Sequence, residues 1–547
     1  MKKDVIDIIK TSLHSLGVDP IPTIEVEVPP NDSMGDIATT VAMSLSRQLK
    51  KHPRKIAEDI VSNIGDNSFF KKIDIAGPGF INFTFSMEYL FAELKKLILY
   101  KSKFLRENIG KDRKIQIEFI SANPTGPLHL GHGRGGAVGQ ALANLLKAAG
   151  FNIEREYYIN DAGKQVKLLG LSVFARYQQL LGNDYQFPED GYKGGYIEDI
   201  AKEIIREKGK EHNQKDFQEV SDFFIDFSYR KILSGIKDDL KEFGISFDTW
   251  QSERQLFDSG EVKNAIEDLR DKGFIYEKDG ATWFRATLFG DDKDRVIIKK
   301  DGEYTYFTSD IAYHRKKIEK RFDELIDIWG ADHHGYIPRI EAVIEALGYP
   351  KEKLKVLIVQ MVNLMRGGKP VQMSKRAGEF VTLREVIDEV GPDITKFIFL
   401  TRRPDSHLDF DLDVAKTQSS ENPVFYVQYA NARINSIFNY AIENGINVEN
   451  LNDATLGFLT TSEELKIIKK LLTYKMVFEG AVNAREPHRI TFFLQELAGI
   501  FHPYYNKYRI IGNDIKLSRA RLALCEAIRI VLRDGLEILG VSAPEKM

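Results

Sequence analysis

Residues 118–132 read EFISANPTGPLHLGH and continue as GRGGAVGQALANLLKAAGF through residue 151. The stretch begins inside KIQIEFI, residues 114–120, whose alternating apolar side chains predict a β-strand. A glycine-rich turn then leads into apolar residues at helical spacing that end at Gly150, and the strand-like IEREYYI follows. Strand, helix and strand in this order predict a βαβ unit of the nucleotide-binding kind.

The 547 residues exceed what one hydrophobic core normally supports, so we expect several domains. Residues 1–108 combine a helical start with the strand-like KKIDIAGPGFINFTFS, which predicts a small α/β domain. Residues 109–418 alternate strand and helix signals, with a charged insertion at about 165–290 and a connecting region at about 395–418. In residues 419–547 apolar side chains recur at helical spacing and predict an α-helical bundle.

The composition is that of an ordinary globular protein, with 43% hydrophobic and 29% charged residues. The single cysteine, Cys525, excludes an intramolecular disulfide and a multi-cysteine zinc site, and its helical surroundings favour a buried thiol. Residues 1–17 lack an uninterrupted apolar segment, and apolar runs elsewhere stay below membrane-spanning length. We therefore expect a soluble, cytoplasmic protein.

The formal net charge of −3 does not indicate a nucleic-acid-binding protein, because such proteins often carry a basic excess. A nucleic-acid surface would have to be local. Two basic clusters are candidates, although a solvated helix face explains either cluster alone. They comprise Arg47, Lys50, Lys51, Arg54 and Lys55 near the start, and Lys507, Arg509, Lys516, Arg519 and Arg521 near the end.

The HLGH segment, residues 129–132, lies between the predicted strand and helix. A helix N-terminus there offers free backbone N–H groups and the positive end of the helix dipole, and glycines allow close approach of a nucleotide. His129 and His132 can then donate hydrogen bonds to phosphate oxygens and stabilise charge that develops at an attacked α-phosphate. Four residues alone leave this reading and an incidental glycine-rich turn about equally supported.

The segment GGKPVQMSKRAG, residues 367–378, has glycines near both ends, which suggests a mobile loop. Lys375 and Arg376 could hold a leaving pyrophosphate by charge. Taken alone, a basic surface loop is the better interpretation.

Together the two segments resemble the paired signatures of class I aminoacyl-tRNA synthetases, HIGH as HLGH and KMSKS as QMSKR. The order and the wide separation of the segments match too. Other stretches resemble the arginine-specific members, the arginyl-tRNA synthetases. These stretches are EFISANPTGPLHLGH, YYINDAG, GADHHGYIPR and SSENPVFYVQYANARI, together with DSMGDIATTVAMSLS and IAGPGFINF of their N-terminal domain and RLALCEAIRIVLRDGLEILGV of their anticodon-binding domain.

The resemblance implies a Rossmann-like class I synthetase catalytic domain between a small N-terminal α/β domain that binds tRNA and a C-terminal α-helical bundle that binds the anticodon. It implies catalytic roles for His129, His132 and Lys375. The implied ATP site comprises His129, Gly131, His132, Gly133, Met373, Ser374 and Lys375. Gln372 replaces the first lysine of the second signature, and Lys369 is a candidate to supply the missing charge.

The resemblance also implies an arginine site. A guanidinium group needs planar acceptors such as a carboxylate, and Tyr306 and Asp310 match the family's pair for this group. From spacing alone, Asp310 could equally cap a helix, and Asn123 before Pro124 could simply form a turn. The full set implied for arginine is Glu118, Ser121, Ala122, Asn123, His132, Tyr306, Asp310 and His334.

For tRNA, stacking aromatics and nearby cations suggest Tyr426, Tyr429, Tyr504, Lys507 and Arg509. We expect no protein metal site, because adjacent histidines such as His333 and His334 rarely converge on one ion. Mg²⁺ would arrive with ATP.

The resemblance implies a two-step reaction, in which L-arginine and ATP give arginyl-adenylate and the arginyl group then passes to the 3′ end of tRNA(Arg). It also implies a monomer without an editing domain. Three rival interpretations are a cysteinyl enzyme, a silent tRNA-binding paralogue and a nucleotidyltransferase. The lone Cys525 argues against the cysteinyl enzyme. The silent paralogue is disfavoured by the intact His129, His132 and Lys375, and the nucleotidyltransferase by the long helical tail.

Overall fold

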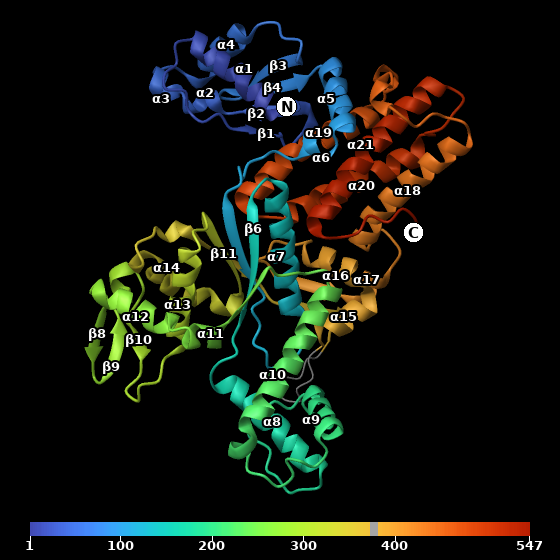
Figure 1. Ribbon diagram of the computed structural model, residues 1–547. Coiled ribbons are helices and arrows are strands. Elements are labelled where there is room, and N and C mark those ends of the chain that lie inside the picture. Colours follow the sequence, from blue (N-terminus) through green and yellow to red (C-terminus); the bar gives the residue numbers. More distant parts are fainter. Residues whose placement is uncertain (372–380) are drawn as a thin grey trace.

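The computed structural model describes residues 1–371 and 381–547, apart from the side chain of Asp32. Figure 1 shows a small α/β region at the N-terminus, a central region built on a sheet, and a C-terminal helical bundle beside both. Helix α5 (Met87–Tyr100) of the first region contacts helices α19 (Ser462–Ala484) and α21 (Ile515–Leu539) of the bundle.

The N-terminal region contains a four-stranded antiparallel sheet in the order β1-β2-β4-β3. The turn at residues 77–79 joins β3 to β4, as the Gly-Pro-Gly sequence predicts. The elements are α1 (Lys2–Ser15), β1 (Val26–Glu27), β2 (Ile37–Thr39), α2 (Val41–Ser44), α3 (Ser46–Leu49), α4 (Pro53–Ile64), β3 (Phe70–Ala76), β4 (Phe80–Phe85) and α6 (Ser102–Leu105).

The central sheet has five parallel strands in the order β12-β11-β5-β6-β7. Helix α7 (Leu130–Ala148) connects β5 to β6 and approaches the sheet closely, because a Cβ atom at Gly139 would lie 2.3 Å from the Phe119 ring. The carboxyl ends of all five strands lie at one edge, where open α/β sheets bind ligands. The strands are β5 (Lys114–Phe119), β6 (Asn152–Ile159), β7 (Thr249–Ser252), β11 (Glu324–Gly330) and β12 (Leu354–Val359).

The expectation of one insertion over about residues 165–290 is wrong in one respect, because β7 belongs to the central sheet. The strand reads TWQS, and four mostly polar residues give no strand signal in the sequence. Figure 1 shows α8, α9 and α10 projecting away from the sheet as one unit. They are α8 (Lys164–Leu180), α9 (Gly195–Lys208) and α10 (Phe217–Glu242).

A second unit follows β7 and has its own hydrophobic core and a small antiparallel sheet in the order β10-β9-β8. Its helix α13 (Tyr306–Glu319) leads directly into β11, and Lys317 of α13 contacts Glu118 of β5 and Asp327 of β11, so this unit packs against the central sheet. The other elements are α11 (Glu253–Asp258), α12 (Glu261–Asp271), β8 (Ile275–Lys278), β9 (Ala281–Phe284), β10 (Arg295–Ile298) and α14 (Ile337–Ala346).

After β12 the chain forms a three-stranded sheet in the order β14-β13-β15, in which β13 and β15 are parallel. The short strand β15 was not expected, since strand signals fade after about residue 395. The elements are β13 (Val362–Arg366), β14 (Lys369–Pro370), α15 (Leu383–Val390), α16 (Pro392–Phe399), β15 (Leu408–Asp411) and α17 (Leu412–Lys416).

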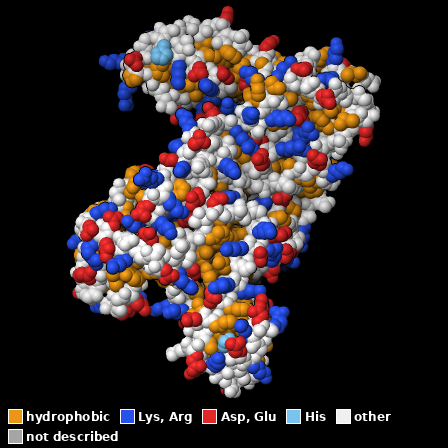
Figure 2. All heavy atoms as spheres, in the orientation of Figure 1, with side chains coloured by type: hydrophobic (Ala, Val, Ile, Leu, Met, Phe, Trp, Pro, Cys, Tyr) orange, Lys and Arg blue, Asp and Glu red, His pale blue; other side chains and the backbone are white. Residues whose placement is uncertain are grey.

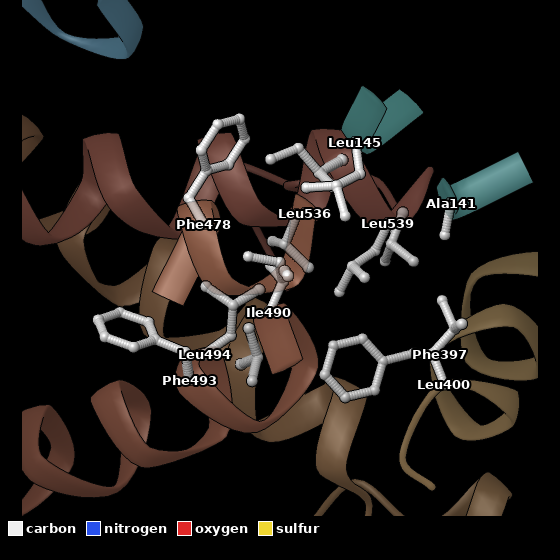
Figure 3. Packing of buried hydrophobic residues seen from close by; sticks show 14 of the residues in the cluster. Ala141, Leu145, Phe397, Leu400, Phe478, Ile490, Phe493, Leu494, Leu536 and Leu539 are labelled. Atoms are coloured by element: carbon white, nitrogen blue, oxygen red, sulfur yellow. The ribbon is translucent and has the colours of Figure 1, made fainter. Parts of the chain in front are cut away.

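The C-terminal bundle comprises α18 (Pro423–Glu443), α19, α20 (His488–Lys507) and α21. Figure 3 shows Leu536 and Leu539 of α21 beside Leu145 of α7 and Phe397 of α16, so the bundle and the central region share one core. Cys525 is fully buried in α21, as expected, and burial raises the pKa of its thiol to about 12. The α/β fold class and the helical C-terminal bundle are confirmed.

Figure 2 shows basic and acidic side chains interspersed over the visible face of every region. This distribution agrees with the net charge of −3. Among the described helices, none combines the length and the apolar character that a bilayer crossing requires.

Candidate active site

The backbone immediately after β5 is strained. Ile120 and Ser121 have φ values of 69° and 41°, a region that residues with a Cβ atom rarely adopt. This turn lets the Ser121 hydroxyl donate to Glu118 Oε1 at 2.9 Å and accept from the Tyr158 N–H at 3.1 Å. Such strain persists where surrounding contacts fix it and is common at functional sites.

The two histidines of the HLGH segment form the N-terminal cap of α7. The Gly131 N–H donates to His129 Nδ1 at 3.1 Å, and the His129 N–H donates to His132 Nδ1 at 3.3 Å. Because both Nδ1 atoms accept, each ring carries its proton on Nε2 and can donate it to a ligand. The rings stack with centroids 3.6 Å apart.

Both rings are neutral in this arrangement. Burial, together with the neighbouring His129, lowers the pKa of His132 to about 3. Burial also lowers the pKa of His129, against an opposing effect of Asp332. The pair therefore offers two neutral hydrogen-bond donors rather than two cations.

The glycines of this segment have different surroundings. Gly131 lies over the His129 ring at the partly exposed start of α7. Gly133 is buried, and a Cβ atom there would lie 2.6 Å from Leu383 Cδ1. A packing requirement of α7 against α15 thus accounts for Gly133.

A cleft of about 870 Å³ opens in front of the histidine pair. Asn123, His129, His132 and Thr382 line it, together with residues 189–196 before and at the start of α9. The Tyr196 hydroxyl donates to the Thr125 carbonyl at 2.8 Å and holds this loop against the strand end. Asn123 also donates to Gln165 Oε1 at 2.9 Å, so its side chain does more than form a turn.

Asp310 lies inside α13, whose N-cap is Thr305, so the interpretation of Asp310 as a helix cap is wrong. The Tyr336 hydroxyl donates to Asp310 Oδ2, and burial raises the pKa of Asp310. Tyr306 is the first residue of the same helix, and its side chain is 56% exposed at the edge of the site. His334 lies on the exposed 3₁₀ turn that follows β11.

The sequence analysis missed Glu253, the residue directly after β7. Glu253 is 3% exposed, and the Ser309 hydroxyl donates to its Oε1 atom at 2.6 Å, while no described residue hydrogen-bonds its Oε2 atom. Burial, with Asp310 and Asp161 nearby, raises the pKa of Glu253 to about 7. Its position at the carboxyl end of a parallel strand would have identified it, had β7 been recognised.

The remaining residues expected at the arginine site surround the strained turn. Ala122 is 6% exposed, and its carbonyl accepts from the Tyr157 hydroxyl at 2.9 Å. Glu118 is 7% exposed and lies between Ser121 and Lys317 of α13. Glu118, Asp310 and Glu253 therefore place carboxylates at the ends of β5 and β7 and on the helix that precedes β11.

Three family models match the chain. The catalytic-domain model described as tRNA synthetases class I (R) matches residues 93–440. The arginyl tRNA synthetase N terminal domain matches residues 3–85, and the DALR anticodon binding domain matches residues 427–547. The chain belongs to the arginyl-tRNA synthetase family.

Individual relatives of this family agree. The arginine–tRNA ligase of Syntrophotalea carbinolica is 51% identical over 528 residues, which cover 96% of this chain and 95% of the relative. That of Geobacillus kaustophilus is 49% identical, with coverages of 97% and 95%. The Thermus thermophilus arginyl-tRNA synthetase structure, at 21% identity, has the same fold with a TM-score of 0.79 over 100% of both chains.

The second synthetase signature lies outside the described residues. Met373, Ser374 and Lys375 fall within residues 372–380, as do Gln372 and Arg376. Lys369 is described and lies on β14, with an exposed side chain.

The structure offers little to bind a metal ion at this site. Among the described residues, no three His, Cys, Asp or Glu side chains gather in a group that could hold one. The His333 ring lies 3.6 Å from Asp332, and both side chains are largely exposed.

The residues expected to contact tRNA lie on the bundle. Tyr429 stacks on the Arg433 guanidinium at 4.5 Å, and Tyr505 lies on the guanidinium at 4.4 Å. Arg433 also donates to His502 Nδ1 at 3.0 Å, and the His502 Nε2–H donates to the Tyr426 carbonyl at 3.0 Å.

The assignment of Tyr504 to this surface is wrong. Its side chain is 1% exposed, and its hydroxyl donates to the buried Glu464 at 3.1 Å. Four residues on, Tyr508 is only partly buried, because α20 ends at Lys507 and the backbone of Tyr508 is extended. Lys507 and Arg509 are exposed, and Lys507 forms an ion pair with Glu463.

Proposed function

We propose that this chain is an arginine–tRNA ligase, which uses ATP to join L-arginine to the 3′ end of tRNA(Arg). The observation that supports the proposal best is the pairing, at one edge of the sheet, of two neutral histidine donors with the half-buried carboxylate of Asp310 and the buried carboxylate of Glu253. The donors suit phosphate oxygens, and the carboxylates suit a guanidinium cation.

In the first step the arginine carboxylate attacks the α-phosphate of ATP, giving arginyl-adenylate and releasing pyrophosphate. His129 and His132 donate from Nε2 to the phosphate oxygens and stabilise the charge that develops there. Gly131, which has no side chain, lets the nucleotide approach the start of α7. Mg²⁺ enters bound to ATP as part of the substrate.

The residues of the second signature complete this step. We assign Lys375 to the leaving pyrophosphate, with Met373 and Ser374 at the nucleotide. Lys369 supplies a second positive charge in place of Gln372.

Arginine binds between two groups of residues. Asp310, Tyr306 and Glu253 receive the guanidinium, whose planar fork of donors matches carboxylate oxygens. Glu118, Ser121, Ala122 and Asn123, with His132 and His334, hold the end that carries the α-amino group. An amino acid without the guanidinium would leave buried acceptors unpaired, so selection needs no editing step.

In the second step the terminal ribose hydroxyl of tRNA attacks the adenylate carbonyl, forms an ester bond with the arginyl group and releases AMP. We assign tRNA binding to residues 1–108 and anticodon contacts to residues 419–547, with Tyr426, Tyr429, Lys507 and Arg509 at the RNA surface. The catalytic domain spans residues 109–418. The protein acts in the cytoplasm as a monomer.

The test is aminoacylation of total bacterial tRNA by the purified protein, with each of the twenty amino acids tried separately. Charging with arginine alone supports the proposal, and charging with another amino acid overturns the assignment of the pocket. Absence of charging with every amino acid would indicate a silent paralogue.

Two variants extend this test to the second signature. Lys375→Ala should abolish charging, and Lys369→Ala should slow adenylate formation. Unchanged adenylate formation in Lys369→Ala would contradict the role given to Lys369 and leave the ligase assignment intact.

A further inference from the structure

A chain of buried charged groups runs behind the proposed arginine site, between β5, β11 and α13. Lys317 of α13 forms ion pairs with Glu118 Oε2 of β5 and, at 2.8 Å, with Asp327 Oδ1 of β11. Asp327 Oδ2 also lies 3.1 Å from His314 Nε2. The side chains of Lys317, Asp327 and His314 are at most 4% exposed, and that of Glu118 is 9% exposed.

The His314 ring links Asp310 to these groups. Its Nδ1 atom lies 2.8 Å from the Asp310 carbonyl oxygen. Its Nε2 atom lies 3.1 Å from Asp327 Oδ2. Hydrogen bonds and ion pairs therefore follow one another from Asp310 through His314, Asp327 and Lys317 to Glu118.

This row of buried side chains connects the two ends of the proposed arginine pocket. His314 holds the backbone of Asp310, which receives the guanidinium, and Lys317 holds the side chain of Glu118, at the α-amino end. Ser121 occupies the other oxygen of Glu118, so the carboxylate has a fixed orientation. Only the small exposed part of the Glu118 side chain is accessible to a ligand.

Lys317 has no substitute among its described neighbours. Burial raises the pKa of Glu118, and the charge of Lys317 opposes that effect. Lys320, one turn later on α13, binds Glu154 and Glu156 instead, at 2.9 and 3.0 Å. Glu156, the register partner of Glu118 on β6, also accepts from the Tyr313 hydroxyl at 2.6 Å.

We propose that Lys317 is a positioning residue for the amino-acid substrate, which keeps Glu118 ionised and in one orientation to receive the α-ammonium group of arginine. This inference rests on the proposed function, because it takes Glu118 as part of the arginine site. Lys317 itself does not touch the substrate.

The first experiment compares Lys317→Met with Lys320→Met, a matched control on the same helix. ATP–pyrophosphate exchange at saturating tRNA gives the KM values for arginine and for ATP. We expect the KM for arginine to rise about tenfold to a hundredfold in Lys317→Met, with the KM for ATP unchanged and Lys320→Met close to wild type. Equal rises in both KM values would indicate a general structural role and overturn the proposal.

The second experiment changes the ligand. 5-Guanidinopentanoate is arginine without its α-amino group, and its inhibition constant against arginine should be the same in Lys317→Met and wild type. Weaker inhibition of the variant by this analogue would contradict a role that acts through the α-ammonium group.

The third experiment is a double-mutant cycle, which also covers a Lys317→Met protein that fails to fold. The double variant, Lys317→Met with Glu118→Gln, lacks both charges. Asp327 keeps its contact with His314. If Lys317 acts only through Glu118, the double variant has the same KM for arginine as Glu118→Gln alone. A further rise in the double variant overturns the proposal.

The cycle distinguishes a wrong assignment of the α-amino site from a wrong role for Lys317. A wild-type KM for arginine in Glu118→Gln would show that the assigned α-amino site is wrong, and the inference would fail with it. A raised KM in Glu118→Gln with an unchanged KM in folded Lys317→Met would leave the site standing and refute only the role of Lys317.

The pH dependence supplies a further readout. In Lys317→Met, Glu118 loses its only described ion-pair partner and faces Asp327, Glu156, Tyr158 and Tyr313, with His314 beyond Asp327. Its pKa then rises further, so kcat/KM for arginine should be low near neutral pH and should increase as the pH is raised. A profile parallel to that of wild type would contradict the proposal.

Discussion

The proposed arginine pocket and the surface of the helical bundle contain charged groups in different surroundings. In the pocket, Glu253 is buried, and none of the described residues pairs with its second oxygen. On the bundle, Arg433 is partly exposed and lies between the rings of Tyr429 and Tyr505. The first arrangement leaves a carboxylate oxygen for a cationic ligand to contact, whereas the second covers a cation with aromatic rings.

The two arrangements suit two unlike ligands. A small amino acid is selected by a few desolvated charges, each of which contributes strongly. Single-stranded RNA is bound by stacking and by exposed cations, each of which contributes modestly. Substitutions at the two regions should therefore differ both in size of effect and in the substrate affected.

The largest effect is expected from Asp310→Asn. The substitution removes the charge that faces the guanidinium and should lower kcat/KM for arginine by about two to three orders of magnitude. Pyrophosphate exchange at varied arginine concentration measures this, with the exposed Asp271→Asn on α12 as control. A decrease below about threefold would mean that Asp310 does not receive the guanidinium.

Glu253→Gln should have a smaller effect that depends on pH. With a pKa of about 7, raised mainly by burial, Glu253 of the free enzyme is protonated below neutral pH. The wild-type kcat/KM for arginine should therefore fall as the pH is lowered from 8 to 6. His132, with its pKa lowered to about 3, does not titrate in this range.

In Glu253→Gln this inflection should disappear, and kcat/KM for arginine at pH 8 should be about tenfold below wild type. The pH profile of arginine activation in both proteins measures it. An inflection that persists in the variant would assign the titration to another group.

On the bundle, Tyr429→Ala should raise the KM for tRNA about fivefold to tenfold, because stacking on one base contributes on the order of 1 kcal/mol or more. Tyr440→Ala is the matched control, a largely exposed tyrosine further along α18. Charging kinetics at varied tRNA concentration distinguish the two. Equal behaviour of the two variants would place the RNA contact elsewhere.

The smallest effect on RNA binding is expected from Tyr504→Phe. Its hydroxyl donates to the buried Glu464, so the variant should lose about 1–3 kcal/mol of unfolding free energy and keep the wild-type KM for tRNA. Urea denaturation and charging kinetics measure the two quantities. A raised KM for tRNA with unchanged stability would restore Tyr504 to the binding surface.

The succession of β5, α7 and β6 along the chain could be predicted, because local sequence patterns encode it. The same patterns place His129 and His132 at the start of α7. KIQIEFI became β5, and HLGH became the start of α7. Glu253 could not be found, since the short polar strand β7 that positions it carries no strand signal. The contact between Lys317 and Glu118 joins residues 199 positions apart and depends on how α13 packs under β5.

The bundle shows a different limit of sequence analysis. Aromatic residues near cations suggested an RNA surface, but the sequence HPYYNKYR does not state which side of α20 faces solvent. Packing against α18 and α19 decides this, and it buries Tyr504 while leaving Tyr505 beside Arg433.

We propose that the pocket binds arginine and the bundle surface binds tRNA independently of each other. The decisive measurement is the KM for arginine and the KM for tRNA in both Asp310→Asn and Tyr429→Ala. We expect Asp310→Asn to raise only the KM for arginine and Tyr429→Ala to raise only the KM for tRNA. If each variant raises both KM values to a similar extent, the two sites are not independent.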